Sequence, residues 1–223
     1  MVNKLVLFDL DGTLTNPKLG ITSGVQHALE KFGIHEPNLT RLESFIGPPL
    51  RASFMDGYGF SEEDAKTAVS YYREYFDPIG WRQNEVFPGI PDVLSVLQDG
   101  GYMIGLATSK PTVFAERILT HFGLRDAFSV VIGSNLDGTR EDKAEVIGAA
   151  LAEASRAASS ANLNFVVMVG DRKYDIVGGK KWGLGTVGVT YGFGSLEELQ
   201  SAGADHIVDR PLALIDAIAS LAK

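Results

Sequence analysis

KLVLFDLDGT, residues 4–13, joins a short apolar run to two aspartates. The run at residues 5–8 predicts a buried strand, and Asp9 and Asp11 follow at its carboxyl end, the edge where a parallel α/β sheet binds ligands. Two carboxylates buried there repel each other, and Mg²⁺ would relieve the repulsion because it prefers oxygen ligands. On this segment alone, a strand-end turn built on Asp11 and Gly12 remains a second interpretation.

Beyond residue 90, apolar runs alternate with amphipathic helical stripes. Strands are expected near residues 102–107, 129–132, 164–169, 185–189 and 206–208, and a closing helix at 211–221. This alternation predicts an α/β fold, with a Rossmann-like, mostly parallel sheet covered by helices on both faces.

The segment after the first strand has a different pattern. Residues 19–76 show helical spacing throughout, with Gly33 in the position of a helix end and Ser61 at a helix start followed by acidic residues. We therefore expect a helical domain at 16–83, inserted into a catalytic core made of 1–15 and 84–223. Two linkers at nearly the same place would form a hinge.

Composition limits the classes of function. Of 223 residues, 20 are Lys or Arg and 28 are Asp or Glu, so the formal net charge is −8, and no surface for polymeric nucleic acid is expected. The absence of cysteine excludes thiolate metal sites and cysteine catalysis. No apolar run is long enough to span a bilayer, and the start lacks the pattern of a signal peptide, so we expect a cytoplasmic protein with no membrane partner.

Further polar groups follow the predicted strands. Thr108, Ser109 and Lys110 come after the strand near 102–107, where hydroxyl and backbone N–H groups could hold phosphate oxygens; an ordinary helix start is the alternative. Lys143 follows a polar loop, and a solvated surface lysine is the alternative there.

The strongest of these groups is VGDRKYD, residues 169–175, which again places two carboxylates after an apolar strand. Gly170 allows close approach of the backbone. Asp171 and Asp175 are four positions apart, so a helix that began there would carry both on one face. With the two aspartates of the first strand, they should converge on the carboxyl edge of the sheet.

Taken in order, residues 9–13, Thr108, Lys143 and residues 170–175 resemble the four motifs of the haloacid dehalogenase-like hydrolases. The resemblance covers essentially the whole chain, including the helical insertion. It implies a haloacid dehalogenase-like core with an α-helical cap domain, a Mg²⁺ cofactor and a small phosphorylated metabolite as substrate. We expect a monomer or a small homo-oligomer.

The resemblance also implies roles for individual residues. Asp9 would be the nucleophile that forms an aspartyl-phosphate, and Asp11 the general acid and base. Mg²⁺ would be held by Asp9, by Asp11 through its backbone carbonyl, and by Asp171, with Asp175 completing the site. Thr108 and Lys143 would bind the transferring phosphoryl group. The residues implied in substrate binding are Gly12, Thr108, Ser109, Lys110 and Lys143 in the core, and Gly47 and Arg51 in the cap.

Finer similarities indicate a branch of the family. Residues 45–50, 107–111 and 187–194 resemble phosphoglycolate phosphatases, while 71–76, 138–143 and 168–175 resemble bacterial proteins assigned as 5′-nucleotidases. Nucleoside monophosphates are therefore the expected substrates, and 2-phosphoglycolate or another small metabolite is the alternative. A phosphomutase and a non-catalytic binding protein rank lower. For Arg51, a surface position at a helix start is the alternative to substrate contact.

Overall fold

The computed structural model describes residues 3–158 and 163–222. The chain divides into two compact units, which we call the core unit and the helical unit. The core unit joins Met1–Thr15 to Val86–Lys223, and the helical unit is Asn16–Glu85. The strands β2 (Thr15–Asn16) and β3 (Glu85–Val86), where the chain passes from one unit to the other, form a two-stranded sheet.

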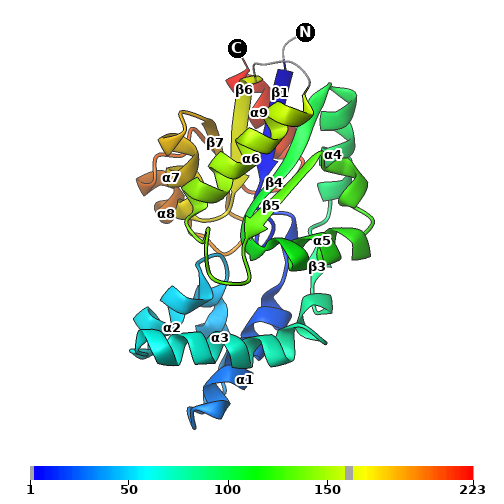
Figure 1. Ribbon diagram of the computed structural model, residues 1–223. Helices are drawn as coiled ribbons and strands as arrows, with labels where there is room; N and C mark the ends of the chain where they lie inside the picture. Colours follow the sequence, from blue (N-terminus) through cyan, green and yellow to red (C-terminus); the bar gives the residue numbers. More distant parts are fainter. Residues whose placement is uncertain (1–2, 159–162, 223) are drawn as a thin grey trace. The chain divides into compact units, whose positions relative to one another are not determined.

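The core unit is built on a parallel sheet (Figure 1). Within the described residues this sheet has six strands in the order β5-β4-β1-β6-β7-β8, and the neighbouring strands run parallel. The strands are β1 (Asn3–Phe8), β4 (Tyr102–Pro111), β5 (Val130–Ser134), β6 (Leu163–Gly170), β7 (Gly185–Val189) and β8 (His206–Val208). The predicted α/β class and mostly parallel sheet are confirmed.

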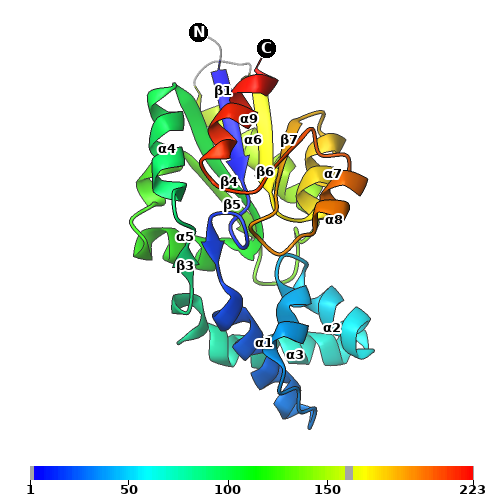
Figure 2. The same cartoon turned by 180° about the vertical axis from the view of Figure 1, so that it is seen from behind.

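Helices cover both faces of this sheet, which explains why its central strand is apolar at consecutive positions. Leu5, Val6, Leu7 and Phe8 of β1 are all fully buried. Helices α6 and α7 pack against each other on the face seen in Figure 1, and α4 and α9 lie on the face seen in Figure 2. The helices of the core unit are α4 (Ile90–Asp99), α5 (Thr112–His121), α6 (Lys143–Ala157), α7 (Lys173–Lys181), α8 (Leu196–Ser201) and α9 (Ala213–Leu221).

The start of α6 is defined by a side-chain cap. The Oδ1 atom of Asp142 accepts hydrogen bonds from the backbone N–H groups of Ala144 (2.9 Å) and Glu145 (3.3 Å). Such caps satisfy the amide groups that have no partner inside a helix. As a result, the helix begins at Lys143 and brings that lysine to the sheet edge.

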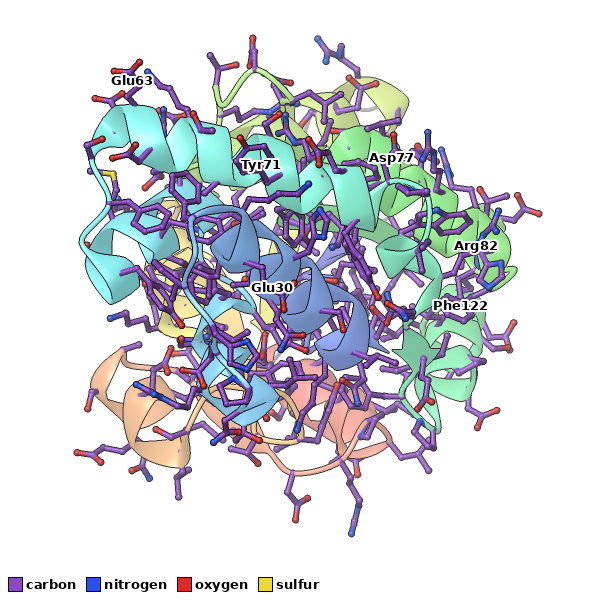
Figure 3. The ribbon with its side chains drawn as sticks, turned by 90° about the horizontal axis from the view of Figure 1, so that it is seen from below. Glu30, Glu63, Tyr71, Asp77, Arg82 and Phe122 are labelled. Carbon is purple, nitrogen blue, oxygen red and sulfur yellow. The ribbon has the colours of Figure 1, made fainter. Side chains whose placement is uncertain are left out.

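The helical unit consists mainly of α1 (Lys18–Lys31), α2 (Leu50–Tyr58) and α3 (Glu62–Phe76). Helices α1 and α3 lie side by side; Figure 3 labels Glu30 on α1 and Tyr71 on α3. A Cβ atom at Gly24 would lie 2.8 Å from the Tyr72 ring, so this glycine permits the close contact. The predicted helix start at Ser61 is confirmed, because its side chain caps α3 through the backbone N–H of Asp64 at 3.1 Å.

Some elements differ from expectation. Helix α8 was not expected, and β4 continues past residue 107 to Pro111, so Thr108 to Lys110 lie within its last residues. Among the described residues, no helix combines the length and the apolar character of a membrane-spanning segment.

Candidate active site

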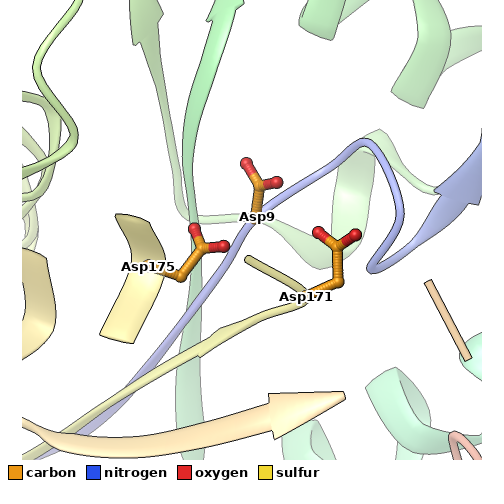
Figure 4. A group of neighbouring side chains, drawn as sticks. All are labelled: Asp9, Asp171 and Asp175. Atoms are coloured by element: carbon orange, nitrogen blue, oxygen red, sulfur yellow. The ribbon is translucent and has the colours of Figure 1, made fainter. Parts of the chain in front are cut away.

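Three carboxylates meet at the carboxyl edge of the sheet (Figure 4). Asp9 follows β1, Asp171 follows β6, and Asp175 lies in the first turn of α7. Strands β1 and β6 are neighbours, and Phe8 lies opposite Val169 near their ends. The residues that follow the two strands therefore start next to each other. One carboxylate oxygen of each aspartate lies within 4.8 Å of the others, and all three residues are buried.

Asp171 and Asp175 are brought together by a strand-to-helix turn, so the expectation that one helix face carries both is wrong. Asp171 precedes α7, which begins at Lys173. The Oδ2 atom of Asp175 accepts a hydrogen bond of 3.1 Å from the backbone N–H of Arg172, which caps the helix. Gly170 makes room for this arrangement, because a Cβ atom there would lie 2.0 Å from the Asp175 carboxyl carbon.

Lys143 lies among these carboxylates. Its Nζ atom is 2.7 Å from Asp9 Oδ1 and 2.7 Å from Asp175 Oδ1, and it donates to the Ala107 carbonyl at 3.1 Å. Burial alone would lower the pKa of Lys143, but Asp175 and Asp9 outweigh that effect and raise it. Lys143 is therefore a buried cation, and the alternative of a solvated surface lysine is excluded.

A second buried ion pair joins Asp11 to Lys110. The Lys110 Nζ atom lies 2.8 Å from Asp11 Oδ2, and the side chains are 5% and 10% exposed. Burial raises the pKa of Asp11, and the charge of Lys110 opposes that shift. Thr108, 1% exposed, accepts a hydrogen bond of 3.3 Å from the Lys110 backbone N–H, while the Ser109 carbonyl accepts one of 2.7 Å from the Ser134 hydroxyl.

The charges at this edge do not balance. Four buried carboxylates face two buried lysines, Lys110 and Lys143, which leaves two negative charges when all are ionised. Burial, together with Asp175 and Asp9, raises the pKa of Asp171 well above its usual range. Among the described residues, the buried oxygens Asp11 Oδ1 and Asp171 Oδ1 have no hydrogen-bond partner. The unpartnered Asp171 oxygen and this charge fit a hard divalent cation such as Mg²⁺.

The segment after β7, residues 190–194, packs over this edge. Its sequence indicated a branch of the family but no contact with the site. The backbone N–H of Phe193 donates to Asp171 Oδ2 at 2.8 Å. A Cβ atom at Gly192 would lie 2.2 Å from the Gly12 carbonyl oxygen, and one at Gly194 would lie 1.8 Å from the Asp171 carbonyl oxygen. The sequence signal for this role was Gly192 and Gly194 on either side of Phe193, just after the strand.

Gly47 and Arg51 belong to the helical unit. Gly47 has a φ of 103°, a conformation that favours glycine. Arg51 lies in α2, and its Nη1 atom is 3.8 Å from a Glu62 carboxylate oxygen. Their contact with substrate stays a prediction.

The chain also matches known proteins in sequence and in structure. Residues 6–189 match the family model described as haloacid dehalogenase-like hydrolase. The chain belongs to the haloacid dehalogenase-like hydrolases. This membership confirms the resemblance seen in the motifs, and within the family the chain is a phosphoric monoester hydrolase.

Three individual proteins illustrate what the chain is similar to. A 5′-nucleotidase of Pseudomonas aeruginosa is 48% identical over 201 residues, which cover 90% of this chain and 89% of that protein. The tyrosine-protein kinase PtkA of Mycobacterium tuberculosis is 38% identical over 86% of this chain, which spans only 63% of its length. The crystal structure of a predicted phosphatase from Clostridium acetobutylicum superimposes with a TM-score of 0.92 at 45% identity, covering 99% of this chain and 100% of that one.

Proposed function

We propose that this protein is a Mg²⁺-dependent phosphomonoesterase that hydrolyses nucleoside monophosphates through an aspartyl-phosphate intermediate. The observation that carries the proposal is the position of Asp9. Its carboxylate lies 2.7 Å from the Lys143 ammonium, and one of its oxygens is within 4.8 Å of a carboxylate oxygen of Asp171 and of Asp175. Phosphoryl transfer depends chiefly on such positioning and charge neutralisation.

In the proposed reaction, Asp9 attacks phosphorus and its carboxylate forms the bond to the phosphoryl group. Asp11 donates a proton to the leaving-group oxygen as the P–O bond breaks. It then takes a proton from the water that hydrolyses the aspartyl-phosphate, which restores both aspartates. Lys143 holds the Asp9 carboxylate through its 2.7 Å ion pair and stabilises negative charge on the phosphoryl oxygens.

Mg²⁺ would be held by Asp9, Asp171, Asp175 and the backbone carbonyl of Asp11. When bound, it would neutralise charge on the phosphoryl group and on the crowded carboxylates. The Thr108 hydroxyl, together with backbone groups of Gly12 and Ser109, would orient the phosphoryl oxygens.

The substrate class is supported by similarity to a protein named 5′-nucleotidase at 48% identity. A phosphatase for 2-phosphoglycolate or another small metabolite would use the same core residues and is the second candidate. We further propose that the helical unit is a cap that selects the substrate, with Gly47 and Arg51 near it. The cytoplasmic location and the monomeric or small homo-oligomeric state stay predictions.

Phosphate release from a panel of small phosphomonoesters tests the proposal. Wild type, Asp9→Asn and the control Asp99→Asn, an exposed aspartate at the end of α4, are compared with Mg²⁺ and with EDTA. We expect wild type and the control to prefer nucleoside monophosphates, and Asp9→Asn or EDTA to abolish activity. A preference for phosphoglycolate would replace the substrate and keep the mechanism, whereas full activity of Asp9→Asn would refute the mechanism.

A further inference from the structure

We propose that Lys110 is a positioning residue that holds one carboxylate oxygen of Asp11 and leaves the other directed to the leaving group of the substrate. This inference rests on the proposed function, in which Asp11 is the general acid. It replaces the substrate-binding role that the sequence resemblance implied for Lys110.

The two carboxylate oxygens of Asp11 have different surroundings. Oδ2 lies 2.8 Å from the Lys110 ammonium, whereas Oδ1 is buried and has no hydrogen-bond partner among the described residues. A carboxylate held through one oxygen by a cation has little freedom to rotate. Oδ1 is therefore the atom that can carry the proton and give it to the substrate.

Burial strengthens the attraction between Lys110 and Asp11. The side chains of Lys110 and Asp11 are 5% and 10% exposed, so water screens their attraction much less than it would on the surface. The backbone of Lys110 is held as well, because its N–H donates to the Thr108 hydroxyl at 3.3 Å. Lys110 thus links the acid to the strand end that carries the phosphate-binding hydroxyl.

The basicity of the leaving group predicts for which substrates Lys110 should affect the rate. When the P–O bond of an alkyl ester breaks, the leaving alkoxide is strongly basic and needs the proton from Asp11 Oδ1. The phenolate released from p-nitrophenyl phosphate is stable without a proton. Loss of the positioning residue should therefore slow alkyl esters much more than p-nitrophenyl phosphate.

The experiment measures kcat/KM for a nucleoside monophosphate and for p-nitrophenyl phosphate with saturating Mg²⁺. kcat/KM reports the steps up to departure of the leaving group, so the later activation of water by Asp11 does not enter. The variants are Lys110→Met, Asp11→Asn and the double variant. The control is Lys180→Met, because Lys180 pairs with Asp205 beside Thr186, near the opposite end of β7.

We expect Lys110→Met to lower kcat/KM for the nucleotide by about 10²-fold, the lower range of general acid catalysis, and for the aryl ester by less than about 10-fold. Asp11→Asn should show the same selectivity, and the double variant should be no worse than Asp11→Asn, because residues that act as a unit are not additive. Lys180→Met should match wild type on both esters.

The outcomes separate this inference from the proposed function. If Asp11→Asn slows both esters equally, the acid role of Asp11 is wrong. If Asp11→Asn is selective but Lys110→Met slows both esters equally, Lys110 binds the phosphoryl group and the inference is overturned. Should Lys110→Met fold poorly, Lys110→Gln is the second variant, because its side-chain amide can still donate to Asp11 Oδ2. We expect Lys110→Gln to lower kcat/KM selectively for the nucleotide, by less than Asp11→Asn does. An equal loss of kcat/KM on both esters would again overturn the inference.

Discussion

Lys143 and Asp9 are 134 positions apart in the sequence, yet the lysine Nζ atom lies 2.7 Å from the aspartate Oδ1 atom. The contact forms because α6 begins at Lys143 beside the end of β1. Asp175 approaches the same ammonium at 2.7 Å. One cation thus joins the end of the first strand to the first turn of α7.

Replacing Lys143 by Met should lower kcat/KM for nucleoside monophosphates by about 10²–10³-fold, the effect of removing one charge-stabilising donor from an active site. The loss should appear on alkyl and aryl esters alike, because Lys143 acts on the phosphoryl group that all of them share. Steady-state kinetics check this, with the exposed Lys66→Met as the control. A loss confined to alkyl esters would contradict it.

Mg²⁺ should stabilise the folded protein, because a ligand that binds only the native state raises the free energy of unfolding by about 2.7 kcal/mol at 100 times its Kd. Asp171→Asn removes a carboxylate that would hold the ion, and its melting temperature should respond little to Mg²⁺. Thermal melts at increasing Mg²⁺ test this without any assay of activity. An equal response of wild type and Asp171→Asn would argue against Asp171 as a ligand.

Much of this edge was predictable from local sequence. An apolar run followed by aspartate marks the ends of β1 and β6, and the parallel fold places those ends side by side. The position of Asp171 before α7 was not predictable, because a spacing of four is compatible with a helix face and with a turn. The short helix α8 has only six residues, too few for a clear periodic pattern.

Long-range side-chain contacts were the other unpredictable part. A lysine after a strand can point to substrate, solvent or a neighbouring loop, and sequence spacing does not distinguish these directions. The pairing of Lys110 with Asp11 depends on the neighbouring strands β4 and β1 and on the turn through Gly12, whose φ is 85°. Likewise, the hydrogen bond from Phe193 to Asp171 uses a backbone N–H, which carries no sequence signal.

Without divalent cation, stability should depend on the pH through Asp175. Burial raises the pKa of Asp175 to about 6, although Lys143 opposes the shift. In the unfolded chain the pKa of aspartate is about 3.9. Between these values the folded state keeps a proton that the unfolded state has lost. The free energy of unfolding therefore falls as the pH rises from about 4 to about 6, by at most about 1.4 kcal/mol per pH unit.

This dependence can be isolated by comparing melting temperatures of wild type and Asp175→Asn in EDTA. The stability of wild type relative to the variant should fall across that pH range, and Mg²⁺ at neutral pH should recover it. A constant difference between the two proteins from pH 4 to pH 7 would show that Asp175 does not titrate in this way.

Gly194→Ala should weaken Mg²⁺ binding by about 10-fold or more, as is typical when groups that orient metal ligands are disturbed. Its Cβ atom would lie 1.8 Å from the Asp171 carbonyl oxygen, so the backbone beside that aspartate must move. Gly57→Ala is the matched control, because its nearest neighbour is a Phe45 ring atom at 4.0 Å. Titration calorimetry measures both affinities, and equal values would show that the segment after β7 does not orient Asp171.

Ser61→Ala should destabilise the helical unit by about 1 kcal/mol, the usual cost of losing an N-cap side chain. The hydroxyl accepts the 3.1 Å hydrogen bond from the Asp64 backbone N–H, and Ala leaves that amide without this partner. Ser70→Ala, at an exposed position later in the same helix, should be neutral or slightly stabilising. Urea denaturation measures both, and no difference between them would contradict the capping role.

The central position of β1 also matters while the protein is being made. β1 leaves the ribosome well before its neighbours β4 and β6, which begin only at Tyr102 and Leu163. Until β6 has emerged, one side of β1 has no strand to pair with, and Asp9 lacks the aspartates that follow β6. An incomplete nascent chain therefore carries Asp9 without Asp171 and Asp175, and the site assembles only after β6 has been made.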